Sequence, residues 1–173
     1  MFLNFFEHAN IVGAISVTIM FAFILAMFFA YKNYKNNASV FITSAVLVLN
    51  FVIANNVVYE MLELTTAAGP DFYLKWVQYN ALSIIAIVAI HLALGVKHHK
   101  ISLVTMYLLL INVIMYLSMH IDIILNGNRT PWWLWSLYTP VVNLTEISIA
   151  VIIIVYSVFH QSVWFKKAKK EFA

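Results

Sequence analysis

The sequence of 173 residues contains no cysteine, only three prolines and four glycines, and 10% charged residues. The absence of cysteine excludes disulfides, thiolate metal sites and cysteine nucleophiles. The scarcity of glycine and proline argues against a loop-rich or disordered chain. Soluble domains carry about 25% charged residues, so the charged fraction of this chain is too low for an ordinary soluble protein.

The sequence is correspondingly rich in apolar residues. Hydrophobic residues make up 64% of the sequence and aromatic residues 16%, and the mean hydropathy is +0.89. An ordinary soluble domain is about 45–50% apolar. Nucleic-acid binding is not expected, because the net charge of +3 comes from ten scattered Lys and Arg residues rather than from a basic stripe. The composition indicates an integral membrane protein.

Long apolar segments define the expected architecture. A transmembrane helix needs about 20 mostly apolar residues, and a barrel strand would show alternation of period two, which these segments lack. We therefore expect an all-α, polytopic membrane protein with one transmembrane domain over residues 1–173. Its five spanning helices are predicted at about 9–31, 39–62, 74–96, 101–125 and 136–162.

The start of the fifth helix allows two interpretations. Thr139 and Pro140 form a typical helix start, in which case residues 131–138 are an interfacial segment. Otherwise Pro140 lies inside the helix and kinks it near its outer end. Trp132, Trp133 and Trp135 are expected in an interfacial belt in either case.

The basic residues are distributed unevenly between the connections. Lys75 and Arg129 fall on one side of the predicted bundle, and eight of the ten basic residues fall on the other. The positive-inside rule places this second side in the cytoplasm, with the N-terminus outside and the C-terminus cytoplasmic. We expect a multi-pass protein of the cell membrane, the inner membrane in a bacterium. The eight residues are Lys32, Lys35, Lys97, Lys100, Lys166, Lys167, Lys169 and Lys170.

Polar residues within the apolar segments share helix faces. Such residues are costly in lipid, so each polar stripe is expected to turn inward at about 3.6 residues per turn. Asparagines then lie at increasing depth from the outer surface toward one buried carboxylate, that of Glu146. The sequence therefore predicts an outward-facing polar pocket that ends at this acid. Its residues are Asn56, Asn80, Asn112, Tyr116, Asn143 and Glu146.

Glu146 is the residue on which a function depends. No Lys or Arg is expected at its depth, and desolvation favours the neutral form of a buried carboxyl group. The site could then bind a proton, a cation or a polar solute. The alternative is structural, because asparagine side chains in membrane helices often form hydrogen bonds between neighbouring helices.

The cytoplasmic half of the bundle is expected to be nearly pure hydrocarbon apart from His91 and Ser157. His98 and His99 fall in a short cytoplasmic turn between two lysines. Contact with anionic lipid is the role expected for this turn.

A second set of polar residues falls at the predicted outer boundary. His8, Glu60, His120 and Asp122 offer nitrogen and oxygen ligands that suit zinc or iron, provided that the helix ends converge. Ordinary polar residues at helix ends are the alternative. No cofactor is otherwise predicted. Catalysis is not expected, because the sequence has no zinc-protease motif, phosphate loop or nucleophile elbow.

One hairpin carries a resemblance to a known class of protein. The run 59–63, Tyr-Glu-Met-Leu-Glu, followed by 75–79, Lys-Trp-Val-Gln-Tyr, resembles the helical hairpins of membrane sensor regions in bacterial histidine kinases. This resemblance implies a sensor role.

Three functional classes follow from the sequence. The first is a small transport or ion-coupled protein or subunit, and the second is a sensor or assembly subunit of a larger membrane complex. The third is a metal-dependent membrane protein. Five helices are few for a complete transporter, so besides the lipid bilayer we expect a homo-oligomer or a larger membrane complex.

Overall fold

The computed structural model describes residues 19–32, 37–64 and 71–161, with side chains placed except at 55–64 and 160–161. This part of the chain is all-helical and contains no strand, which confirms the all-α part of the predicted fold class. Its elements are a first helix over Ile19–Lys32, α2 over Ala38–Leu64, α3 over Phe72–Ala93, α4 over Lys100–His120, a π-helical turn η1 over Ile121–Leu125, and α5 over Trp133–Gln161.

Three of these helices are long and apolar enough to cross a membrane. They are Phe72–Ala93, Lys100–Leu125 and Trp133–Phe159. The described parts Ile19–Lys32 and Ala38–Ala54 form shorter apolar helices. The bounds of the second to fifth predicted segments differ from those observed by three residues or fewer. The predicted start of the first segment lies outside the described residues.

The interpretation of residues 131–138 as a separate interfacial segment is wrong. Helix α5 already begins at Trp133 and contains Pro140. A proline inside a helix removes one backbone hydrogen bond and crowds the preceding turn. The first turn of α5 is held despite this loss, because Leu134 is buried and the indole of Trp135 is bound to Asp122.

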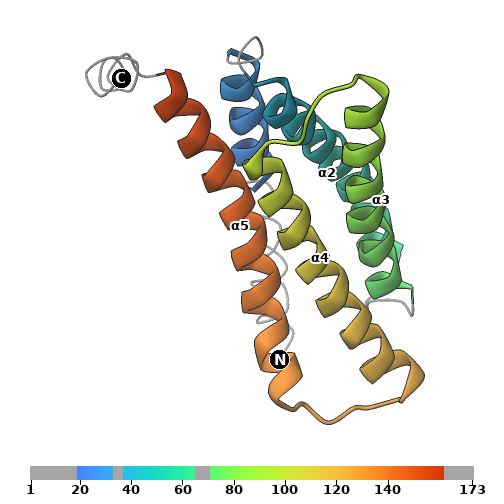
Figure 1. Cartoon of the computed structure of the whole chain (residues 1–173). Coiled ribbons are helices and arrows are strands. Elements are labelled where there is room, and N and C mark those ends of the chain that lie inside the picture. Colours follow the sequence, from blue (N-terminus) through green and yellow to red (C-terminus); the bar gives the residue numbers. More distant parts are fainter. Residues whose placement is uncertain (1–18, 33–36, 65–70, 162–173) are drawn as a thin grey trace.

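Helix α4 is central, since it packs against α2, α3 and α5 (Figure 1). The α3–α4 connection lies at the top of the view and the α4–α5 connection at the bottom. We call the first end of the bundle the histidine end, because His91, His98 and His99 lie there. We call the opposite end, which holds Trp132 and Trp135, the tryptophan end.

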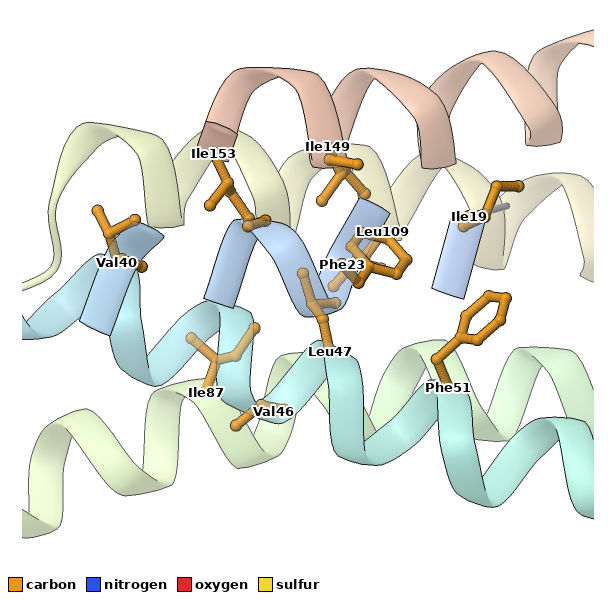
Figure 2. Packing of buried hydrophobic residues seen from close by; sticks show 13 residues of the cluster. Ile19, Phe23, Val40, Val46, Leu47, Phe51, Ile87, Leu109, Ile149 and Ile153 are labelled. Carbon is orange, nitrogen blue, oxygen red and sulfur yellow. The ribbon is translucent and has the colours of Figure 1, made fainter. Parts of the chain in front are cut away.

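The core is apolar and receives side chains from every helix (Figure 2). Phe23 of the first helix meets Phe51 of α2 edge to face, with ring centroids 5.7 Å apart. The outward faces carry exposed Leu, Ile, Val and Phe side chains. A soluble monomer rarely exposes so large an apolar surface, and lipid suits it. The labelled core residues are Ile19, Phe23, Val40, Val46, Leu47, Phe51, Ile87, Leu109, Ile149 and Ile153.

A glycine turn ends α3 and directs the loop that follows. Gly95 has a φ of +63°, a conformation that a side chain makes unfavourable. Its N–H donates to the carbonyl of Leu92 at 3.2 Å, and the N–H of Val96 donates to that of His91 at 2.9 Å. These two bonds form a Schellman motif, which satisfies the last carbonyls of α3. The turn brings His98 back to the end of the bundle.

Candidate functional site

The polar stripes of α3 and α4 face the interior, as the helical spacing predicts. Such burial requires that polar atoms find partners within the bundle or bound water. The buried residues of these stripes are Asn80, Ser83 and His91 on α3 and Ser102, Thr105, Asn112 and Tyr116 on α4.

Asn112 joins α4 to α5. Its side chain is 0% exposed, and its Oδ1 accepts a hydrogen bond from the hydroxyl of Thr145. The Thr145 hydroxyl also lies 2.8 Å from the carbonyl oxygen of Val142 within α5. Among the described residues, the amide nitrogen of Asn112 has no hydrogen-bond partner. The oxygen of this buried amide therefore has a structural role, and its nitrogen does not.

Glu146 follows Thr145 directly and is half-buried. Its carboxylate lies close enough to Tyr116 and Tyr138 to interact electrostatically with both. Among the described residues, no Lys, Arg or His side chain acts on this carboxylate. An unpaired carboxylate in an apolar surrounding is held most cheaply as the neutral acid or with a bound cation.

Aromatic rings from three helices line the region around Glu146. Tyr116 of α4 stacks on Trp76 of α3 at 5.8 Å between centroids, with planes inclined by 12°. Tyr138 of α5 meets Tyr116 edge to face at 5.6 Å and Tyr73 at 5.8 Å. The rings fix the relative positions of α3, α4 and α5 beside Glu146.

The other predicted pocket residues have different surroundings. The amide nitrogen of Asn80 donates to the carbonyl of Trp76, one turn earlier in α3, at 2.9 Å. Asn143 is half-buried, one turn before Glu146 on α5. The side chain of Asn56 lies outside the described residues. The structure thus brings Asn112, Tyr116 and Glu146 together, while a binding role for the whole set stays a prediction.

The Asp122 carboxylate accepts hydrogen bonds from nitrogen donors. Its carboxylate accepts from the indole N–H of Trp132 at 2.9 Å and of Trp135 at 2.7 Å, and from the amide of Asn128 at 3.1 Å. The residue therefore ties η1 to the α4–α5 connection and to the start of α5. Sequence reasoning gave these tryptophans only an interfacial role and missed this contact.

The metal site at the outer boundary stays a prediction. His8 lies outside the described residues, as does the side chain of Glu60. Within the part of the chain that is described, no three His, Cys, Asp or Glu side chains form a group that could hold a metal ion. His120 is half-buried, and its Nδ1 has no hydrogen-bond partner in the part of the chain that the structure describes.

The histidine end holds a polar network, so the expectation of a nearly pure hydrocarbon half is wrong. Ser39 is its hub: its Oγ lies 2.8 Å from Nε2 of His91 and 2.8 Å from Oγ of Ser102, and it accepts from the backbone N–H of His99 at 2.9 Å. The Thr43 hydroxyl donates to Ser102 Oγ at 2.8 Å. Hydroxyl groups in this apolar region are stable because the network satisfies them.

His98 and His99 turn toward the bundle, in addition to any contact with lipid. The ring of His98 stacks on His91. Burial, followed by the neighbouring His91, lowers the pKa of His98 from its ordinary value. His99 caps α4 by accepting from the N–H of Ile101 at 3.2 Å, and its Nε2 lies 3.2 Å from the hydroxyl of Tyr156 on α5.

A sequence signal for this network did exist. Ser39 and Thr43 are one turn apart on α2, and so are Ser102 and Thr105 on α4. Each pair therefore shares a face, by the same spacing that identified the other stripes.

No family model matches the chain, and no curated protein or solved structure does so either.

Proposed function

We propose that this chain is a polytopic membrane protein that exchanges a proton or small cation at Glu146. The observation that carries the proposal is a half-buried carboxylate that interacts electrostatically with Tyr116 and Tyr138 and has no cationic partner among the described residues. A permanent buried charge would be costly without such a partner. A carboxyl group that gains and loses a proton or cation avoids that cost.

The orientation is part of the proposal. Lys32, Lys97 and Lys100 lie at the histidine end, whereas Lys75 and Arg129 lie at the tryptophan end. The positive-inside rule then assigns the histidine end to the cytoplasm and the tryptophan end to the outside. Glu146 exchanges with the outer side in this arrangement. The cell membrane and assembly into a homo-oligomer or larger complex complete the proposal.

Purified protein reconstituted in liposomes that contain a pH-sensitive dye tests this function. An imposed membrane potential should drive proton entry in the wild type. Glu146→Gln keeps the size and polarity of the side chain but cannot ionise, so the flux should fall about tenfold or more. Asp71→Asn is the matched control, because this acid is exposed and its side chain makes no cap hydrogen bond.

The outcomes separate the functional classes. Loss of flux in Glu146→Gln with wild-type flux in Asp71→Asn supports the proposal. If flux is low for the wild type, with Na⁺ or K⁺ gradients as well as with protons, transport is refuted and a sensor or assembly role takes its place. Equal flux in Glu146→Gln and the wild type refutes Glu146 as the exchange site.

A further inference from the structure

We propose that residues 96–99, which we call the latch, close the histidine end in an acid-sensitive way: protonation of His98 releases its ring from His91 and opens the polar network around Ser39 to solvent. The inference goes beyond the proposed function, because it concerns a conformational change at the histidine end and does not depend on exchange at Glu146.

The latch covers polar groups that are deeply buried. His91 is 1% exposed, Ser39 2% and Ser102 0%. The ring of His98 stacks on that of His91, and the backbone N–H of His99 donates to Ser39 Oγ at 2.9 Å. Two consecutive residues of the latch thus contact the two central members of the network. Release of the latch uncovers both.

The two imidazoles of the stack are held differently. Both ring nitrogens of His91 have partners, since Nδ1 lies 2.7 Å from the carbonyl oxygen of Ile87 and Nε2 lies 2.8 Å from Ser39 Oγ. The Nδ1 of His98 is buried and has no hydrogen-bond partner among the described residues. His98 is therefore the ring that leaves at the lower cost, while His91 stays on α3.

Protonation makes the stacked position of His98 unfavourable. A histidinium ion carries an N–H on both ring nitrogens, so Nδ1 becomes a buried donor without an acceptor. Burial, followed by the charge of His91, lowers the pKa of His98 in the closed form. The released ring is solvated and binds a proton more readily. A fall in pH below the ordinary histidine pKa of about 6.5 therefore shifts the latch toward the open form.

The groups around the latch provide no counter-charge for a protonated His98. Over residues 38–54, α2 carries no titratable side chain. Helix α5 contributes the hydroxyl of Tyr156, which lies 3.2 Å from Nε2 of His99. Among the described side chains, no carboxylate lies at this end of the bundle. The other charged side chains at this end are Lys32, Lys97 and Lys100, which are all exposed cations.

The backbone on either side of His98 allows its release without unfolding of α3. The N–H of Val96 donates to the carbonyl of His91 at 2.9 Å, within the Schellman turn that ends the helix. This anchor precedes His98 and can persist when the ring leaves. The bond from the N–H of His99 to Ser39 Oγ follows His98 in the chain. It is the bond that we expect to break when the latch opens.

Hydrogen exchange of the His99 amide tests this expectation in the full-length protein. NMR in detergent micelles gives its protection factor, corrected for the intrinsic pH dependence of exchange. The factor should fall several-fold between about pH 8 and pH 5.5. The amide of Asn126 is the matched control, because it donates to the carbonyl of Ile121 at 2.9 Å at the tryptophan end. Its protection should stay constant, and an equal fall at both amides would show general loosening and overturn the latch.

Two substitutions separate the titration of His98 from other effects of acid. His98→Phe keeps an aromatic ring for the stack but takes up no proton, so the His99 amide should stay protected at both pH values. His98→Lys is charged throughout this range, so protection should already be low at pH about 8. His91 and His99 are present in both variants. An acid response of His98→Phe equal to that of the wild type would assign the change to one of these residues and overturn the proposal.

The ring resonances of the wild type give a second measurement, which needs no variant to fold. The stack places each imidazole in the ring-current field of the other. The resulting shifts should disappear along the titration curve of His98, together with the protection of the His99 amide. Titration of His98 with the ring-current shifts retained would show that the charged ring stays on His91, and the latch would be refuted.

Discussion

The ring of His98 lies 4.2 Å from that of His91 between centroids, and the two planes are inclined by only 19°. The two residues are joined by the glycine turn at the end of α3, which returns the chain onto its own helix. A loop residue thereby covers the buried histidine that binds the Ser39 hub. The histidine end is thus closed by a side chain whose protonation depends on its surroundings.

Acidification should destabilise the histidine end. The pKa of His98 is lowered in the folded protein by burial and by His91, so the unfolded chain binds protons more readily. The contribution of His98 to stability is therefore full above the ordinary histidine pKa of about 6.5 and is lost as the pH falls below it. The Tm should fall between about pH 8 and pH 5.5, and His98→Gln should reduce this fall. An equal fall in the variant would contradict the assignment to His98.

Removal of the hub hydroxyl should cost more than removal of an ordinary serine hydroxyl. In Ser39→Ala, the ring of His91 and the N–H of His99 each lose a partner, whereas Ser102 still accepts from the Thr43 hydroxyl. Leaving such buried groups unsatisfied should lower the free energy of unfolding by about 2–4 kcal/mol. Denaturant titration in detergent measures this loss, and Ser118→Ala should stay within about 0.5 kcal/mol of the wild type. Similar losses in the two variants would argue against a cooperative network.

Helical spacing accounts for most of what could be predicted from the sequence. The inward stripes of α3 and α4 follow from the spacing of Asn80 and Ser83 on α3 and of Asn112 and Tyr116 on α4, because a helix presents residues three and four apart on one face. The pairing of Asn112 with Thr145 depends on how α4 and α5 pack, which this periodicity does not encode.

The contacts that were not predicted from the sequence have a common physical cause. His98 and Asp122 both act across a turn, and their partners depend on backbone conformation outside regular helix. The sequence Leu94-Gly95-Val96 is compatible with a Schellman ending, so the return of His98 could have been inferred. The contacts of Asp122 with Trp132 and Trp135 require the path of a whole connection, and no local pattern encodes this path.

Asp122→Asn should loosen the tryptophan end. The carboxylate accepts hydrogen bonds from two indole N–H groups and one amide, and bonds to a charged acceptor are stronger than neutral ones. The substitution replaces one acceptor oxygen with a donor, so the expected loss is about 1.5–3 kcal/mol. Trp132 and Trp135 should become more exposed, which a red shift of tryptophan fluorescence would show.

A chelator separates this structural role of Asp122 from the predicted metal site. If hydrogen bonds alone hold the carboxylate, a metal chelator should leave the wild-type fluorescence and Tm unchanged. A chelator that reproduces the effect of Asp122→Asn would show instead that the residue binds a metal ion.

Gly95→Ala should weaken the turn that positions His98. The φ of +63° disfavours any residue with a Cβ, and no atom of the described residues lies within 4 Å of the position that this Cβ would take. Strain in the backbone is therefore the only expected cost, about 1 kcal/mol. Gly127→Ala is the matched control, since Gly127 has a φ of +64° and equally open surroundings in the α4–α5 connection. Both variants should lower the Tm by similar amounts, but only Gly95→Ala should shift the histidine resonances of the imidazole pair in an NMR spectrum. If Gly127→Ala shifts them as much, the turn at Gly95 does not specifically hold His98 against His91.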